Sequence, residues 1–595
     1  MLLSSLEKDV LSYPKLKERI DRSDDPKKAR SKALKNLDEM KADFSERTIK
    51  LMEKGFDAAL TTLYDGINFN ENGVNLRELM SKGSVVLVPN HQSHADYVAI
   101  NYKFYKKYNR PLYVAGGDNL NIFPIGKIFR GGGCFFIRRS FQSDIIYKLT
   151  MEAYLYALLK QKQPIEFFFE GGRTRSGKLR PPKFGLYSML LEAHSHLPEG
   201  NKGELYFVPV SIAHEYVPEQ RALAKEMMGG KKVKENASQI LGLFKLIAYQ
   251  FGNVHINVGT PIVAHKLEDE RKNKKAVLDL AFKCFRRVGK QMVVTPTSLL
   301  VLIMLDETTG AIKWADIIAK AKAIVQFCMK FDIPFTDSLE VSKLEKTLGR
   351  AIDIMISNDK VEVIGRHDNS TVFYSIKKEC RGELLFFKNT ILHHFIIPWT
   401  INLAWINLFS GKIENVEDLK KFFMEQRDQL KHEFYLPTIK EYFSKTLRVL
   451  SDAVGREITS LEECMNLNYR ELYQVASNLG IFSRTLSYIN EAYYVGAITL
   501  LAFEREGVEL FKGTDFDDKF KAVFDNELKV NRIIRFPESH NIELMKNMRK
   551  YFIQNDFMTK VEGSYKIDDI EALRLYVSRL EKEISEQLKF NLKAI

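Results

Sequence analysis

Short apolar segments alternate with longer helix-like segments between residues 76 and 290, and this alternation most limits what the chain can fold into. The apolar segments are rich in β-branched and aromatic residues, and nearly all of their residues are apolar, as at 84–89 and 205–212. Such strands are typical of a parallel sheet whose two faces are both covered by helices. The sequence therefore predicts an α/β domain with a mainly parallel sheet flanked by helices.

The expected elements divide the chain into three regions, since 595 residues exceed what one domain usually needs. Residues 1–65 are charged and helix-like, and residues 66–290 form the α/β domain. Residues 291–595 form a large, mostly helical C-terminal region. Within the α/β domain we expect strands at 84–89, 112–115, 134–137, 165–169, 205–212 and 254–258, and helices at 143–162 and 185–194.

The net charge limits which partners the protein can bind, and the cysteines limit the compartment in which it works. Lysine and arginine exceed aspartate and glutamate by 89 to 76, a formal charge of +13, which favours anionic partners without choosing among them. The five cysteines are scattered with no CxxC pair, so we expect neither a disulfide framework nor a zinc finger, and a reducing cytoplasm fits. The N-terminus meets charged residues too early for a secretory signal peptide.

His91 and Asp96 follow directly after a predicted strand, where α/β proteins place their chemistry. Histidine is a general base near neutral pH, and a carboxylate on its other ring nitrogen fixes the tautomer. One turn after His91 brings Asp96 within reach. The alternative is a metal site with His91, His94 and Asp96 as ligands, joined by His194 and His196. However, residues 194 and 196 lie on a helix-like stretch, where they point to different sides.

Two basic segments follow. In the first, at 131–140, a glycine turn enters a short strand that ends in Arg138 and Arg139; because neighbouring strand residues face opposite sides, one of them can face the site. In the second, a strand ends at Glu170, two glycines follow, and five cations lie between residues 173 and 183. Backbone amides and guanidinium groups of this kind can bind a phosphate dianion.

A nucleotide-binding P-loop is excluded at 172–178, although the glycine and lysine spacing matches. Leu179 stands where a Ser or Thr would hold magnesium, and Pro181 and Pro182 interrupt the helix that such a loop opens. A fourth segment, 207–216, is a buried strand ending in His214, Glu215 and Tyr216, which either are structural or line a pocket.

In this order the four segments resemble the glycerolipid acyltransferase superfamily, and their longer spellings resemble its glycerol-3-phosphate acyltransferase branch. Segments 116–126, 134–140 and 170–178 carry the likeness, which continues through 257–261, 294–298 and 386–393. Cys134 departs from the pattern, since the family usually has a small residue such as Ala there.

The resemblance implies that His91, oriented by Asp96, deprotonates a hydroxyl of glycerol 3-phosphate, which then attacks the thioester of acyl-CoA or acyl carrier protein. It implies no metal or tightly bound cofactor. The substrate-binding residues would be Arg138, Arg139, Glu170, Gly171, Gly172, Arg173, Arg175 and Lys183.

Two other functions stay open. Within enzymes, the acceptor could be dihydroxyacetone phosphate or lysophosphatidate. Outside enzymes, a basic membrane- or nucleic-acid-binding protein is conceivable, but no RRM, KH or helix-turn-helix pattern is present, and we expect no nucleic-acid partner.

We expect a peripheral or monotopic protein on an anionic phospholipid membrane, at the cytoplasmic face of a bacterial inner membrane. The uncharged segment 389–411 contains two histidines, three asparagines and a proline. It is either a buried helical hairpin or an interfacial membrane element anchored by Trp399 and Trp405.

Overall fold

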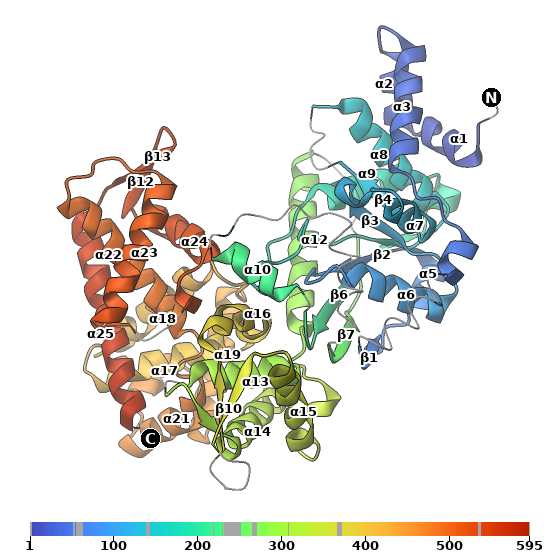
Figure 1. Ribbon diagram of the computed structural model, residues 1–595. Helices are drawn as coiled ribbons and strands as arrows, with labels where there is room; N and C mark the ends of the chain where they lie inside the picture. The colour runs from blue at the N-terminus through green and yellow to red at the C-terminus, as the bar shows by residue number, and fades with distance from the viewer. Residues whose placement is uncertain are drawn as a thin grey trace. The chain divides into compact units, whose positions relative to one another are not determined.

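The computed structural model describes residues 3–51, 54, 64–138, 143–217, 219–228, 230, 251–264, 270–307, 309–365, 372–533 and 537–593. The chain forms two compact units (Figure 1). The first, which we call the sheet unit, comprises Met1–Thr174, Leu179–Glu219 and Val233–Val293. The second, the helical unit, comprises Arg175–Lys178, Gln220–Lys232 and Val294–Ile595.

Within the described residues the sheet unit contains an eight-stranded sheet of order β1-β7-β6-β2-β5-β3-β4, with β8 paired to β6. Neighbours from β6 through β4 are parallel, as are β1 and β7, whereas β6 is antiparallel to β7 and β8. The strands are β1 Gly66–Asn70, β2 Gly83–Pro89, β3 Tyr113–Gly117, β4 Cys134–Ile137, β5 Ile165–Glu166, β6 Glu204–His214, β7 Asn253–Val258 and β8 Ile262–Val263. The prediction of a mainly parallel α/β sheet is confirmed.

The apolar strands are buried because helices cover the sheet. All of β2 is buried, and β6 is buried from Leu205 onward. Helix α12 packs against β6, and α7 packs against β4. The helices of this unit are α5 Leu76–Lys82, α6 Asp96–Tyr108, α7 Ile125–Gly131, α8 Ile145–Lys160, α9 Gly185–Ser195 and α12 Glu270–Gln291.

Three N-terminal helices, α1 Ser5–Ser12, α2 Pro14–Asp21 and α3 Pro26–Met40, pack on α8. Their starts follow from local sequence. Ser4 and Glu7 form a capping box on α1, and α2 and α3 begin with Pro14 and Pro26, whose fixed φ suits a first helical position. Asp25 caps α3 through the Lys28 amide.

The helical unit contains α10 and most of the C-terminal half. Its helices are α10 Gln220–Met227, α13 Pro296–Asp306, α14 Trp314–Lys330, α15 Leu344–Ser357, α16 Arg381–Ile391, α17 Ile396–Phe409, α18 Val416–Leu430, α19 Ile439–Val454, α20 Leu461–Met465, α21 Tyr469–Leu479, α22 Ser487–Arg505, α23 Gly513–Lys529, α24 Ile542–Gln554 and α25 Ile570–Lys593. Two small antiparallel sheets accompany them: β9 Ile312–Lys313, β10 Val361–Ile364 and β11 Phe373–Ile376 in one, and β12 Met558–Val561 and β13 Ser564–Ile567 in the other.

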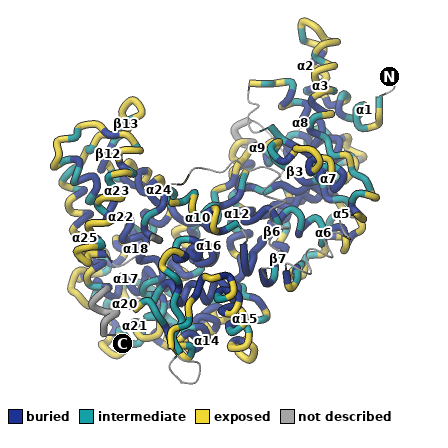
Figure 2. The backbone as a smooth tube through the Cα atoms, in the orientation of Figure 1, coloured by how far each residue is buried: buried dark blue, intermediate teal, exposed yellow. Residues whose placement is uncertain are grey.

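The uncharged segment 389–411 includes the end of α16 and the whole of α17, which packs against α19, α21 and α25. Most of α17 is buried (Figure 2). Trp399 and Trp405 are both almost fully buried. Of the two alternatives from the sequence, the structure has the buried helical one. In the part of the chain that the structure describes, no helix combines the length and the apolar character needed to cross a membrane.

Candidate active site

The site is built at the end of β2. His91 follows this strand after one residue, a short turn comes next, and α6 begins at Asp96. The carboxylate of Asp96 accepts a hydrogen bond from His91 Nδ1 at 2.8 Å. The closeness that the sequence predicted for this pair is therefore present, while its catalytic role stays a prediction.

Asp96 has further donors. Its Oδ2 also accepts from the backbone N–H groups of Gln92 at 2.6 Å and Ser93 at 3.0 Å, and its Oδ1 accepts from His214 Nε2 at 2.6 Å. Burial alone would raise the pKa of Asp96, but the hydrogen bonds from His214 and His91 outweigh it and hold the pKa well below its ordinary value. Asp96 is thus a fully buried carboxylate that bridges two imidazoles.

His91 is fixed on several sides. Its ring stacks on Phe168 at 4.1 Å between centroids and meets the edge of Tyr97 at 6.4 Å. Its backbone N–H donates to Glu170 Oε1 at 3.1 Å, and its carbonyl accepts from the Thr174 amide at 2.8 Å. Its side chain keeps 11% of its surface exposed, and within the described residues its Nε2 has no recorded hydrogen-bond partner. Nε2 is therefore the atom available to a substrate.

Glu170 and the following glycines form the turn beside His91. Glu170 is almost fully buried, and burial raises its pKa to about 8. Gly171 and Gly172 have φ of +66° and +157°, values that side chains with a Cβ rarely adopt. A Cβ on Gly171 would also lie 3.0 Å from Lys183 Cγ. The two glycines are what allow the chain to turn sharply after Glu170.

The predicted cations do not all lie together. Arg173 pairs with Glu219 at 3.3 Å, and Glu219 also accepts from the Ser93 hydroxyl and the His94 amide, so Arg173 lies beside the loop that carries His91. Lys183 is tied to the same turn, since its amide donates to the Phe169 carbonyl at 2.8 Å. Arg180 lies at this turn as well, since its guanidinium donates to the carbonyls of Gly172 and Arg173.

Arg138, at the end of β4, is engaged by a carboxylate. Its Nε donates to Glu39 Oε1 of α3 at 2.7 Å, a second nitrogen pairs with Glu39 Oε2, and the guanidinium lies 4.3 Å from the centroid of the Tyr147 ring. Hydrogen bonding to Glu39 raises the pKa of Arg138 further, so its charge is permanent. Arg139 lies outside the described residues.

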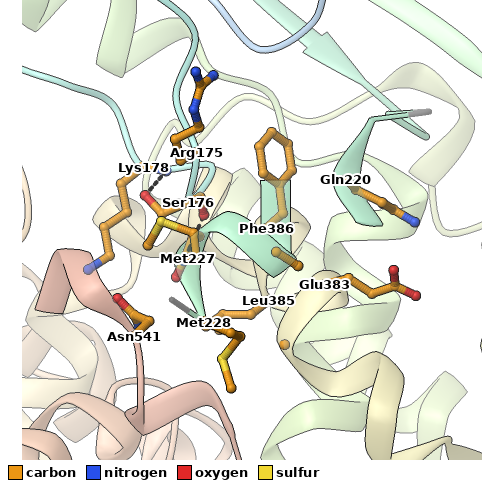
Figure 3. Close-up of a pocket in the computed structure, with 13 residues that line it drawn as sticks. Arg175, Ser176, Lys178, Gln220, Met227, Met228, Glu383, Leu385, Phe386 and Asn541 are labelled. Carbon is orange, nitrogen blue, oxygen red and sulfur yellow. Dashed lines mark hydrogen bonds between the residues drawn. The ribbon is translucent and has the colours of Figure 1, made fainter. Parts of the chain in front are cut away.

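Arg175 belongs to the helical unit, where its Nε pairs with Glu226 at 3.1 Å. It borders a pocket of about 450 Å³, a volume that includes space open to solvent. Figure 3 shows the mixed lining, with apolar side chains from the end of α10 and from α16 beside polar ones. The lining residues are Arg175, Ser176, Lys178, Gln220, Ala224, Met227, Met228, Gly382, Glu383, Leu385, Phe386, Asn389 and Asn541.

Two histidines of the metal alternative are engaged elsewhere. His194 Nε2–H donates to the Gly203 carbonyl at 2.8 Å, and His196 packs against the Tyr13 ring. Among the described residues no group of three or more His, Cys, Asp or Glu side chains could hold a metal ion. That the reaction needs no metal or cofactor stays a prediction.

Two residues at the site were not singled out from the sequence as site residues: His214, weighed only as a possible pocket residue, and Glu219. A signal for His214 existed. β2 and β6 are parallel, so the polar residues that end both strands reach the same edge of the sheet, where α/β proteins carry their sites. Glu219 follows β6 in a loop and carried no such signal.

Comparison with known proteins places the chain in a family. Residues 71–213 match the family model described as Acyltransferase, and together with the α/β fold and the His91–Asp96 pair this places the sheet unit in the acyltransferase class. Residues 223–561, more than half of the chain, match the model described as the glycerol-3-phosphate acyltransferase C-terminal region. The chain belongs to the glycerol-3-phosphate acyltransferase family.

Several curated proteins named glycerol-3-phosphate acyltransferase are similar to the chain. One from Haemophilus ducreyi is 28% identical over 496 residues, which cover 80% of this chain and 59% of the relative. One from Actinobacillus pleuropneumoniae is 30% identical over 389 residues, 62% of this chain and 46% of the relative. One from Pseudoalteromonas translucida is 27% identical over 535 residues, 85% of this chain and 64% of the relative. The chain thus spans about half to two thirds of the length of these relatives.

Proposed function

We propose that this protein transfers a fatty acyl group from an acyl thioester to the sn-1 hydroxyl of glycerol 3-phosphate, which gives lysophosphatidate. The observation that carries the proposal is the buried His91–Asp96 pair, 2.8 Å apart, with Nε2 of His91 turned away from the carboxylate. The names of the similar proteins support glycerol 3-phosphate as the acceptor.

In the proposed reaction, His91 Nε2 accepts the proton of the acceptor hydroxyl as its oxygen attacks the thioester carbonyl. Asp96 holds Nδ1–H and stabilises the imidazolium that forms. The C–S bond then breaks, and the carrier thiol leaves with the proton from His91. Because an acyl thioester is already activated, this scheme needs neither a covalent acyl-enzyme nor a metal or other cofactor.

The phosphate of the acceptor would bind to the cations beside the Glu170–Gly172 turn. Arg173 lies beside the loop of His91, since its partner Glu219 bonds to Ser93 and His94 in that loop. A phosphate dianion would compete with Glu219 for this guanidinium, because the planar guanidinium group donates two parallel hydrogen bonds to a phosphate as it does to a carboxylate. Lys183 is a further cation of this turn. Arg138 and Arg175 are not part of it: Arg138 follows β4 and pairs with Glu39, and Arg175 belongs to the helical unit and pairs with Glu226. Their contact with the substrate stays a prediction.

The donor and the membrane follow from chemistry and charge. Acyl-CoA and acyl carrier protein are both acidic, and a chain of net charge +13 suits either. The proposed product is an amphiphile, so we propose peripheral association with the cytoplasmic face of an anionic membrane.

A donor-and-acceptor matrix tests the proposal. The purified chain is supplied with palmitoyl-CoA or palmitoyl carrier protein and with glycerol 3-phosphate, dihydroxyacetone phosphate or lysophosphatidate, and the extracted lipid is identified by mass. We expect lysophosphatidate from glycerol 3-phosphate to form fastest. Faster acylation of another acceptor would reassign the substrate, and no product with any acceptor would refute acyl transfer by this chain.

A further inference from the structure

The sheet unit exposes a short apolar surface between the 3-10 helix Asp118–Leu120 and α7. Phe123 keeps 85% of its surface exposed, and Ile122 and Ile128 keep 45% and 44%. Pro124 is exposed as well. We call Ile122, Phe123, Pro124 and Ile128 the apolar surface. Large apolar side chains that are exposed together in this way mark an interaction site more often than single exposed ones do.

The apolar surface stands on an ordered frame. Leu120, Ile125 and Phe129, from the same stretch of chain, are buried in one cluster, and Tyr97 packs against that cluster. The amide of Gly126 donates to the carbonyl of Ile122 at 2.7 Å, which closes the turn that presents Phe123. The exposed side chains are therefore held outward by the burial of their neighbours.

This frame reaches the site through one ring. Phe129 meets Tyr97 at 5.6 Å between centroids, and the other side of Tyr97 meets His91 at 6.4 Å. A partner bound to the apolar surface would thus lie a few side chains from the proposed base. The position suits a partner that receives the product of the reaction.

Cations outnumber carboxylates around the apolar surface. From Asp118 to Gly131 the chain carries two cations, Lys127 and Arg130, and one carboxylate, the exposed Asp118. Lys127 is exposed between Phe123 and Ile128, and Arg130 donates to backbone carbonyls at the end of α3, a helix that exposes five further cations and one carboxylate, Asp38. Apolar side chains interleaved with lysine are suited to the interface of an anionic bilayer, where chains enter the acyl boundary and cations meet the headgroups.

We propose that the apolar surface inserts into the interfacial layer of an anionic phospholipid bilayer. The inference rests on the proposed function, because an amphiphilic product gives the enzyme a reason to work at a membrane. A second copy of the chain could also cover such a surface, but copies of a basic surface repel each other, whereas anionic lipid attracts it.

The test compares the full-length wild type with Phe123→Ser/Ile128→Ser and with the control Leu575→Ser, whose leucine on α25 is 73% exposed. Each protein is floated with vesicles of three parts phosphatidylglycerol to seven parts phosphatidylcholine. We expect the double variant to lose at least about tenfold in vesicle partition, since it removes two apolar side chains from the interface, and Leu575→Ser to bind like the wild type.

A tryptophan probe gives a second readout. Phe123→Trp fluorescence should be quenched by vesicles with brominated acyl chains, and Leu575→Trp fluorescence should not. Equal flotation of the double variant and the wild type, or no quenching of Phe123→Trp, would overturn the proposal. A wild-type dimer that the double substitution dissociates, with no change in flotation, would also overturn the proposal.

Acyl transfer to glycerol 3-phosphate in detergent is measured on the same proteins and should be unchanged by the double substitution. If the wild type floats but transfers no acyl group, the proposed function fails while the membrane surface stands. If the wild type transfers acyl groups but never floats, the membrane surface fails while the proposed function stands.

Discussion

Replacing Asp96 with Asn should remove most of the activity while keeping the shape of the site. The carboxylate accepts four hydrogen bonds, from the side chains of His91 and His214 and from two backbone amides. An amide offers one acceptor oxygen and one NH₂ donor in its place. The amide oxygen should take the Oδ2 position, because the two backbone amides donate there, and the NH₂ group then faces His214. The hydrogen bond from His91 Nδ1–H is then accepted by a neutral oxygen.

The expected loss follows from the role of that charge. Without it, the imidazolium that forms in the transition state is no longer stabilised, and general base catalysis contributes about 10²- to 10⁴-fold. We therefore expect Asp96→Asn to lower kcat about 10³-fold. KM for glycerol 3-phosphate should change little, since Arg173 and Lys183 are untouched. Initial rates at saturating thioester, with the acceptor varied, separate the two effects.

His214→Gln is the matched control. The NH₂ group of glutamine can stand in for the Nε2–H that bonds to Oδ1 at 2.6 Å, and the charge of Asp96 and its bond to His91 stay in place. Even a complete loss of this one hydrogen bond to a charged group, about 1.5 kcal/mol, lowers the rate only about tenfold. If Asp96→Asn stayed within threefold of the wild type, or lost less than His214→Gln, the assigned role of the carboxylate would be wrong.

Two further predictions concern buried charges. Burial raises the pKa of Glu170 to about 8, above its unfolded value near 4.5, so the unfolded chain releases this proton first and the wild-type free energy of unfolding falls as pH rises from 5 to 8. Glu170→Gln should remove this fall in the free energy of unfolding, which is on the order of 4 kcal/mol between pH 5 and 8. The free energy of unfolding in urea should therefore depend less on pH for the variant, and an unchanged pH dependence would refute the assignment. Glu433→Gln should lower the free energy of unfolding by about 3 to 5 kcal/mol, because Lys178 would remain buried without its carboxylate. Adding Lys178→Met should recover much of that loss, and a double variant as unstable as the two losses combined would show that the pair is not coupled.

Much of the sheet was predictable because its strands are short segments rich in β-branched and aromatic residues. The predicted strands at 84–89, 134–137 and 254–258 match β2, β4 and β7 within a residue. Strand 165–169 is shorter in the structure, since β5 is only Ile165–Glu166, although the amides of Phe167 and Phe169 still bond to β2 carbonyls. Hydrophobicity does not reveal that β6 and β7 are antiparallel, because a buried strand has the same pattern in either direction.

The His91–Asp96 contact was predictable because only four residues separate the two, and a helix begins at Asp96. The other partners were not, because they are distant in sequence. His214 reaches Asp96 across 118 residues, and Glu39 reaches Arg138 across 99. A run of cations also does not say which of them a carboxylate will pair with, and here Arg173 and Arg175, two residues apart, belong to different units.

The most direct measurement of the central claim is the single-turnover rate of acyl transfer to glycerol 3-phosphate by His91→Ala. A histidine outside the site provides the control, His196→Ala, whose ring packs against Tyr13. We expect His91→Ala to lose at least about 10³-fold and His196→Ala to keep the wild-type rate. A His91→Ala rate within tenfold of the wild type would contradict the account, because the hydroxyl would then be deprotonated without His91.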